Sequence, residues 1–282
     1  MAITVIRLLT YLLVIIATTF LIPSAFGLYY GEPIAIKAFI FPMLAVYAVA
    51  LIFALIFRKK GNNRLSTRSG FVIVASGWVS ACLLGSVPFL LSGKIPNVFD
   101  AIFESVSGFT TTGATILSEV ESLPKCIGIW RVQMCWLGGM GIVALTVALM
   151  PLLGVGGFQL IKAETTGPEK GKITPKITMT AKLLWFIYFG MTVVQTLLLL
   201  LCGMSFFDAL AHSFSTLGTG GFSTRNASIG HYNSAAIDWV CITFMALAGV
   251  NFSLYYQVLI VITSLTNKSK VYLGLSIPSA SM

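Results

Sequence analysis

Charged residues are scarce in this chain of 282 residues. Only 10% of the positions are charged, whereas 57% are hydrophobic and the mean hydropathy is +0.92. A soluble domain of this length does not need so much apolar surface, so the composition indicates an integral membrane protein. Cysteine is also rare: the 5 cysteines have neither metal-site spacing nor the pattern of a disulfide framework. We expect them to act as small apolar side chains.

Catalytic signatures are missing as well. The chain has no G-x-S-x-G or H-E-x-x-H motif, and its 2 histidines, His212 and His231, stand apart. Residues 139–144 fit a dinucleotide-binding pattern, but they lie inside an apolar run and not after a strand. Their glycines are expected to permit close helix packing or a bend that lines a pore. We therefore expect neither enzyme activity nor a cofactor.

Several apolar runs are long enough to cross a bilayer as helices. They cover about residues 5–26, 35–57, 71–91, 128–150, 181–203 and 236–264. If these six spans alternate in direction, most basic residues fall on one side, which the positive-inside rule places in the cytoplasm together with both termini. The other side holds few of the 18 basic residues, namely Lys37, Lys94, Lys125, Arg131 and Arg225. The net charge of +9 is thus a topology signal and does not indicate nucleic-acid binding.

One motif occurs twice in the chain. Residues 100–113 align with residues 208–221, and each copy is a short amphipathic run that ends in a turn rich in threonine and glycine. Each copy also lies between two of the long apolar runs. This is the pattern of a membrane–pore loop–membrane unit, and two such units predict an ion pathway.

The two turns carry the residues that we expect to bind the ion. Turn A comprises Thr110, Thr111, Thr112 and Gly113, and turn B comprises Gly218, Thr219, Gly220 and Gly221. The run before each turn is too short to cross the membrane, and non-helical backbone at that depth is tolerated only where protein or water surrounds it. Backbone carbonyls in such turns can replace the hydration shell of a monovalent cation, and glycine gives the chain the freedom to aim them. The turns therefore predict a selectivity filter for a monovalent cation.

Residues around the turns leave alternatives open. Asp100 and Asp208 begin the two short runs, where they either cap a helix or attract cations. His212 takes the place of Glu104 in the second copy and is expected to pack behind turn B. Arg225, just beyond turn B, either repels cations or pairs with an outer carboxylate.

The predicted fold is an all-α polytopic membrane protein. An N-terminal helix hairpin precedes two membrane–pore loop–membrane repeats. The predicted segments are a hairpin at 1–60, a first repeat at 71–160, a cytoplasmic linker at 161–180, a second repeat at 181–264 and a polar tail at 265–282. The basic linker is either a solvated loop that sets orientation or a docking surface for a regulatory subunit or anionic lipid.

Four stretches together resemble the bacterial Trk-type members of the Trk/Ktr/HKT family of K⁺ transporters. They are residues 107–115, 136–142, 151–160 and 220–224, and the likeness extends over about residues 3–260. The resemblance implies K⁺ uptake across the bacterial inner membrane, a dimeric assembly and a TrkA-like cytoplasmic nucleotide-binding regulatory subunit. Gly113 and Gly221 match the filter glycines that this family places one in each repeat.

The chain also departs from that family, whose members carry four repeats where this sequence has two. We expect a truncated, frameshifted or split gene product. Two turns cannot close a ring, so conduction would need a homodimer or a complementary half-transporter chain in the lipid bilayer. The alternative is a non-conducting remnant or a structural subunit.

Overall fold

The computed structural model describes residues 2–57, 67–141, 177–250 and 255, and these ranges contain helices and connecting turns without a strand. The predicted all-helical fold class is therefore confirmed for the described part of the chain. Most of the expected linker at 161–180 and all of the expected tail at 265–282 lie outside the described residues.

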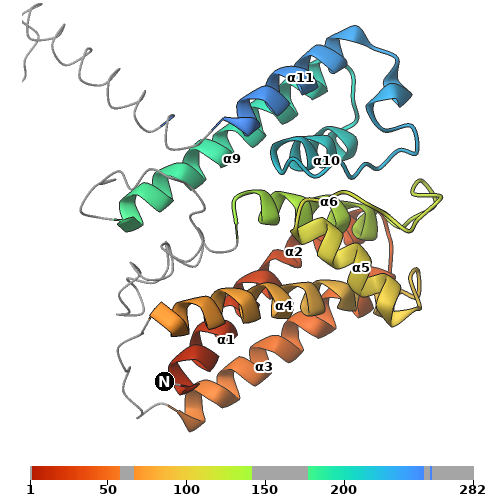
Figure 1. The fold of residues 1–282 in the computed structure, drawn as a ribbon. Helices are drawn as coiled ribbons and strands as arrows, with labels where there is room; N and C mark the ends of the chain where they lie inside the picture. The colour runs from red at the N-terminus through yellow and green to blue at the C-terminus, as the bar shows by residue number, and fades with distance from the viewer. Residues whose placement is uncertain (1, 58–66, 142–176, 251–254, 256–282) are drawn as a thin grey trace, which may run out of the picture.

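Long apolar helices form the larger part of the fold (Figure 1). They are α1 (Ala2–Thr19) followed directly by α2 (Leu21–Tyr29), α3 (Phe41–Ile56) after a π-helical turn (Ile36–Ile40), α4 (Thr67–Ser92) and α9 (Ile177–Leu201). Among the described residues, 4 stretches are long and apolar enough to cross a membrane. These are Ile3–Tyr29, Ile36–Ile56, Gly70–Ser92 and Leu183–Leu201. They correspond to four of the six spans that hydropathy predicts.

The other two expected spans are described only in their first part. Helix α6 (Lys125–Gly139) begins the expected span at 128–150, and α11 (Ala235–Gly249) begins the one at 236–264. Each is 15 residues long, which is too short to cross a bilayer as a helix. The remainder of both predictions lies almost wholly outside the described residues.

Two short helices occupy the positions predicted for the pore loops. They are α5 (Val98–Phe109) and α10 (Phe206–Leu217), and each has 12 residues. Figure 1 shows both at the same end of the molecule, on either side of α6. Turn A follows α5 directly and turn B follows α10, so the repeat in the sequence is also a repeat in the structure.

The N-caps of these helices correct the expectation that Asp100 and Asp208 cap them. The Asn97 side chain accepts a hydrogen bond from the Phe99 backbone N–H and caps α5, and Ser205 caps α10 by accepting from the Asp208 N–H. The residues before both helices have extended backbone, as a cap requires. Asp100 and Asp208 lie within the first turn, where a carboxylate faces the partly positive helix end.

Helix α6 joins the two halves of the structure through two tryptophans. Trp130 is fully buried, contacts the ring of Phe20 at a centroid distance of 4.8 Å and donates its indole N–H to the Gly85 carbonyl oxygen. Further along the same helix, Trp136 packs on the rings of Tyr188 and Phe214 in the second repeat. Because each tryptophan fills a different half of the core, α6 is held between them.

Candidate functional site

Turns A and B have the same backbone conformation. Thr111 and Thr219, at matching positions, have φ of 56° and 52°, and Gly113 and Gly221 have φ of 73° and 83°. Positive φ is common for glycine but uncommon for threonine, and non-glycine residues in this region cost free energy that the surrounding structure must supply. Because both turns have this strained conformation, the surrounding structure stabilises the same turn geometry in each repeat.

Backbone hydrogen bonds close the two turns in the same way. The Thr112 N–H donates to the Ser107 carbonyl oxygen at 2.9 Å, and the Gly220 N–H donates to the Ser215 carbonyl oxygen at 3.0 Å. These bonds cap the last turn of α5 and of α10. The donors of turn A are therefore directed back at α5, and those of turn B at α10.

The carbonyl oxygens of the turns are not used in this way. Within the part of the chain that the structure describes, no donor hydrogen-bonds to a carbonyl oxygen of residues 110–113 or 218–221. Backbone carbonyls without a partner are expensive in an apolar environment unless water or an ion meets them. This arrangement leaves a set of neutral oxygen ligands of the kind that suits K⁺. That these residues bind K⁺ stays a prediction.

The two turns lie against each other. A Cβ added at Gly113 would collide with the Gly220 carbonyl oxygen, and one added at Gly220 would collide with the Cys135 side chain on α6. Two glycines near the end of α6 complete the contact, because Gly138 lies on the Phe109 backbone and Gly139 on the Gly218 backbone. The expectation that glycines here permit close packing is confirmed at Gly139.

A buried ion pair lies behind turn A. The Glu104 side chain on α5 is 0% exposed and the Arg131 side chain on α6 is 1% exposed, with an Arg131 NH2–Glu104 Oε1 distance of 2.7 Å. Glu104 also accepts hydrogen bonds from the Thr115 hydroxyl at 2.9 Å and from the Ile116 N–H at 3.3 Å. All of these partners of the carboxylate come from the first repeat.

Arg131 reaches the second repeat as well. Its NH1 group donates to the Ser223 carbonyl oxygen at 3.3 Å, and its guanidinium carbon lies 4.3 Å from the centroid of the Phe222 ring. The sequence placed Arg131 only among the charges of the outer face. A signal was available, because an arginine inside a predicted span is a functional hypothesis in itself.

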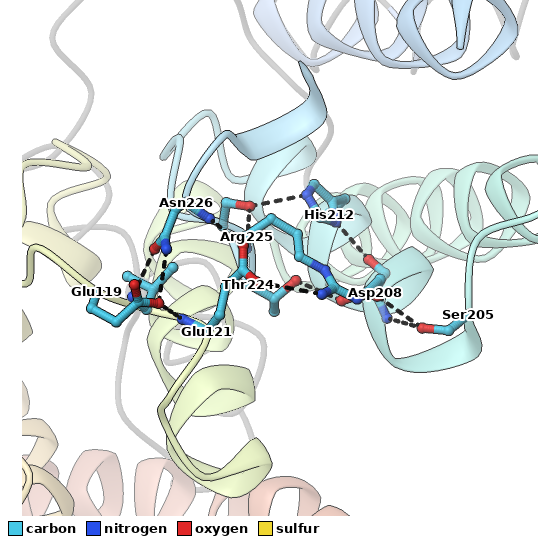
Figure 2. A network of polar contacts seen from close by, with 10 residues as sticks. Glu119, Glu121, Ser205, Asp208, His212, Thr224, Arg225 and Asn226 are labelled. Carbon is cyan, nitrogen blue, oxygen red and sulfur yellow. Dashed lines mark hydrogen bonds and ion pairs between the residues drawn. The ribbon is translucent and has the colours of Figure 1, made fainter. Parts of the chain in front are cut away.

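In the second repeat the position of Glu104 belongs to His212, which is buried behind turn B as expected. Its Nδ1 lies 2.8 Å from the Asp208 carbonyl oxygen and its Nε2 lies 3.1 Å from the Ser223 hydroxyl (Figure 2). A carbonyl can only accept, so Nδ1 carries a proton. Burial lowers the pKa of His212 and so favours the neutral ring, in which Nε2 accepts from the serine hydroxyl.

A buried carboxylate of the second repeat, Asp208, lies one helical turn before His212. It accepts hydrogen bonds from Thr224 at 2.7 Å, from Arg225 at 2.9 Å and from Ser205 at 3.0 Å (Figure 2). Burial alone would raise the pKa of Asp208, but these hydrogen bonds more than offset it and hold the pKa below its ordinary value. The carboxylate is therefore ionised and fully engaged in holding the loop after turn B.

Arg225 pairs with carboxylates, which was the second of its two expected roles. Besides Asp208, its NH1 group lies 3.7 Å from the Glu121 carboxylate of the first repeat. The hydrogen bond with Asp208 is the main reason that the pKa of Arg225 lies above its ordinary value. The guanidinium thus connects the loops that follow the two turns.

Asn226 connects the same loops by hydrogen bonds in both directions. Its Oδ1 accepts from the Val120 N–H at 2.8 Å, its Nδ2 donates to Glu119 at 2.8 Å, and its N–H donates to Glu121 at 3.1 Å (Figure 2). The bond from Asn226 is also the largest cause that lowers the pKa of Glu119. We call these contacts, together with the Arg225–Glu121 pair, the loop clip.

Among the described residues, no group of three or more His, Cys, Asp or Glu side chains could hold a metal ion. The 5 cysteines are free thiols, and all but Cys202 are buried.

Comparison with known proteins gives a consistent result. Residues 38–275 match the model of the TrkH family, described as cation transport protein. The chain is 43% identical over 255 residues to the Trk system potassium uptake protein TrkH of Halomonas elongata and 41% identical over 256 residues to that of Escherichia coli K12. The crystal structure of the potassium transporter TrkH from Vibrio parahaemolyticus is similar in fold, with a TM-score of 0.73 and 36% identity.

The matches cover most of this chain but only about half of each relative. The alignments include 89% and 90% of this chain but 52% of each of the two relatives, and the structural match covers 91% of this chain and 51% of the solved one. The chain therefore spans about half the length of the curated relatives it matches.

Proposed function

Because the chain belongs to the TrkH family of cation transport proteins, we propose that it forms part of a pathway for K⁺ uptake. In this proposal, partly dehydrated K⁺ passes the carbonyl oxygens of turns A and B. The relatives in this family carry names that describe potassium uptake, and the family match at residues 38–275 includes both turns.

The observation that carries the proposal is the duplicated turn. Turns A and B share their φ values and their hydrogen-bonding pattern, and they meet beside α6. Their carbonyl oxygens have no donor in the described part of the chain. A monovalent cation can be coordinated by such neutral carbonyl oxygens, and no charged side chain is needed to bind it.

The proposal includes partners that would complete a ring of ligands with turns A and B. A second copy of this chain would contribute two more turns in a homodimer, and a complementary half-transporter chain would do the same. The bacterial inner membrane with cytoplasmic termini and a TrkA-like regulatory subunit also belong to the proposal. The competing proposal is a non-conducting remnant or structural subunit, which would insert in the membrane and carry no ions.

Rubidium uptake in bacteria without their own K⁺ transporters tests the proposal. The chain is expressed alone, and its amount in the membrane fraction is measured with uptake. We expect uptake that Gly113→Ala and Gly221→Ala each reduce at least about tenfold, because either change displaces a ligand-bearing turn. Uptake that does not respond to either substitution would contradict a path through the turns.

Gly93→Ala is the matched control. Gly93 and Gly221 both have positive φ, 68° and 83°, and both would offer open space to an added methyl group. The backbone strain of about 1–2 kcal/mol is therefore common to both variants, and only Gly221 lies in a turn of the pathway. Absence of uptake by the parent chain, with the protein present in the membrane, would favour the non-conducting alternative.

A further inference from the structure

We propose that Arg131 is a positioning residue that holds turns A and B in register with each other. This inference rests on the proposed function, since the register of the turns matters only where both supply ligands to one ion. Arg131 lies on α6, between the two pore helices, and its side chain is almost fully buried.

On the side of the first repeat, Arg131 is fixed by two groups. Its Nε and NH2 nitrogens both bond to Glu104 Oε1 at 2.7 Å, and NH2 also donates to the Thr115 hydroxyl at 3.1 Å. Glu104 belongs to α5, just before turn A, and Thr115 follows turn A. The guanidinium is thus attached to both ends of the segment that contains the first set of ligands.

On the side of the second repeat, the same guanidinium bonds to the chain just after turn B. NH1 donates to the Ser223 carbonyl oxygen, and the guanidinium lies over the Phe222 ring. Phe222 directly follows Gly221, so any displacement of the guanidinium is passed to turn B within one residue. The planar fork of arginine allows this, because its donors point in fixed directions towards both repeats.

The second repeat has no equivalent of this pair. Alignment of the closing helices, residues 137–141 with 247–251, places Cys241 at the position of Arg131, and His212 stands at the position of Glu104. In the described part of the chain, the ion pairs are formed by Arg131 and Arg225, and none joins Cys241 to His212. Arg131 differs from a pair confined to one repeat because it contacts both repeats beside the turns, whereas the loop clip joins the loops farther along the chain.

The variants are chosen so that loss of the Arg131 contacts can be distinguished from the cost of leaving a buried charge without its partner. In the double variant Arg131→Met and Glu104→Gln, both charges are removed together, so no unpaired charge stays buried. Arg131→Lys keeps the charge but lacks the fork that reaches both Glu104 and Ser223. Lys94→Gln, which changes an exposed lysine just before α5, is the control for loss of one positive charge.

Competition between Rb⁺ and Na⁺ during uptake is the first readout, measured with the amount of protein in the membrane. We expect the ratio of the Rb⁺ to the Na⁺ affinity to fall about tenfold or more in both Arg131 variants, because a ring that discriminates between ions depends on where its oxygens stand. An unchanged ratio in a double variant that accumulates normally would show that Arg131 only stabilises the protein.

The second readout does not need transport, and so it distinguishes failure of this inference from failure of the proposed function. Trypsin cleavage after Arg225 is followed in the purified chain in detergent. Loss of the Arg131 contacts should expose this bond to cleavage several-fold faster than in the parent and in Lys94→Gln. If the parent chain takes up no Rb⁺, equal cleavage rates in the parent and the double variant would overturn the inference on their own.

Discussion

Gly138→Ala should destabilise the protein, although alanine is the better helix former. A Cβ at this position would lie 2.8 Å from the Phe109 carbonyl carbon and 3.2 Å from its Cα, and closer still to its oxygen. All three atoms belong to the backbone at the end of α5, which cannot rotate away as a side chain can. Helix α6 and turn A would therefore have to move apart.

The same substitution at Gly128, nearly three turns earlier in α6, should have the opposite sign. A Cβ there meets only the Phe207 ring, at an ordinary contact distance of 3.6 Å. Replacing glycine by alanine in a helix gains up to about 1 kcal/mol, and overpacking against rigid neighbours costs about 1–3 kcal/mol. We expect Gly128→Ala to stabilise the protein by up to about 1 kcal/mol and Gly138→Ala to destabilise it by about 1–2 kcal/mol.

Thermal unfolding of the purified variants in detergent measures this difference. At about 2–4 °C per kcal/mol for domains of this order of size, the two melting temperatures should differ by roughly 2–12 °C. A Gly138→Ala protein that melts at or above the temperature of Gly128→Ala would refute the close approach of α6 to turn A. It would also remove the packing argument for why turns A and B meet.

Two further predictions concern the loop clip and its neighbour. Asn226→Ala should lower the stability of the protein by about 1–2 kcal/mol, since both hydrogen bonds of the side chain are lost. Glu119→Gln should lower the stability less, because glutamine keeps an acceptor oxygen for Asn226. The melting temperatures of the two variants measure this difference. The pKa of Asp208 lies below its ordinary value in the folded state, so its stabilising effect is complete above about pH 4 and is lost as the pH falls further. Melting temperatures between about pH 3 and 6 should therefore fall more steeply in the parent than in Asp208→Asn, and parallel curves would contradict this assignment.

Hydropathy and internal repetition predicted the parts of the fold that depend on local sequence. Long apolar runs predicted the membrane spans, because the thickness of the bilayer sets the length of a spanning helix. The aligned motifs predicted α5, α10 and both turns. The caps instead lie three residues before the two aspartates, at Asn97 and Ser205. Asp208 was taken for the cap because it begins the aligned motif, whereas the backbone is extended at Ser205, and Ser205 with Asp208 has the spacing typical of a helix start.

The contacts between the repeats could not be predicted in the same way. Arg131 and Glu104 are separated along the chain by turn A and the loop after it, and the bond from Arg131 to Ser223 joins different repeats. Nothing in the spacing of these residues fixes such a pairing. It depends on the position of α6 between α5 and α10, which tertiary packing around Trp130 and Trp136 determines.

The two turns have one backbone conformation but two kinds of support. Behind turn A, the Arg131–Glu104 pair is at most 1% exposed, whereas Arg225, which holds the loop after turn B through Asp208, is 28% exposed. Dissolved salt screens exposed charges strongly and buried charges much less. Turn A is therefore held by an interaction that is largely insulated from the outer solution, and turn B by one that the solution can reach. Because Arg131 also contacts the chain beside turn B, the insulated pair limits how far turn B can move when its own support weakens.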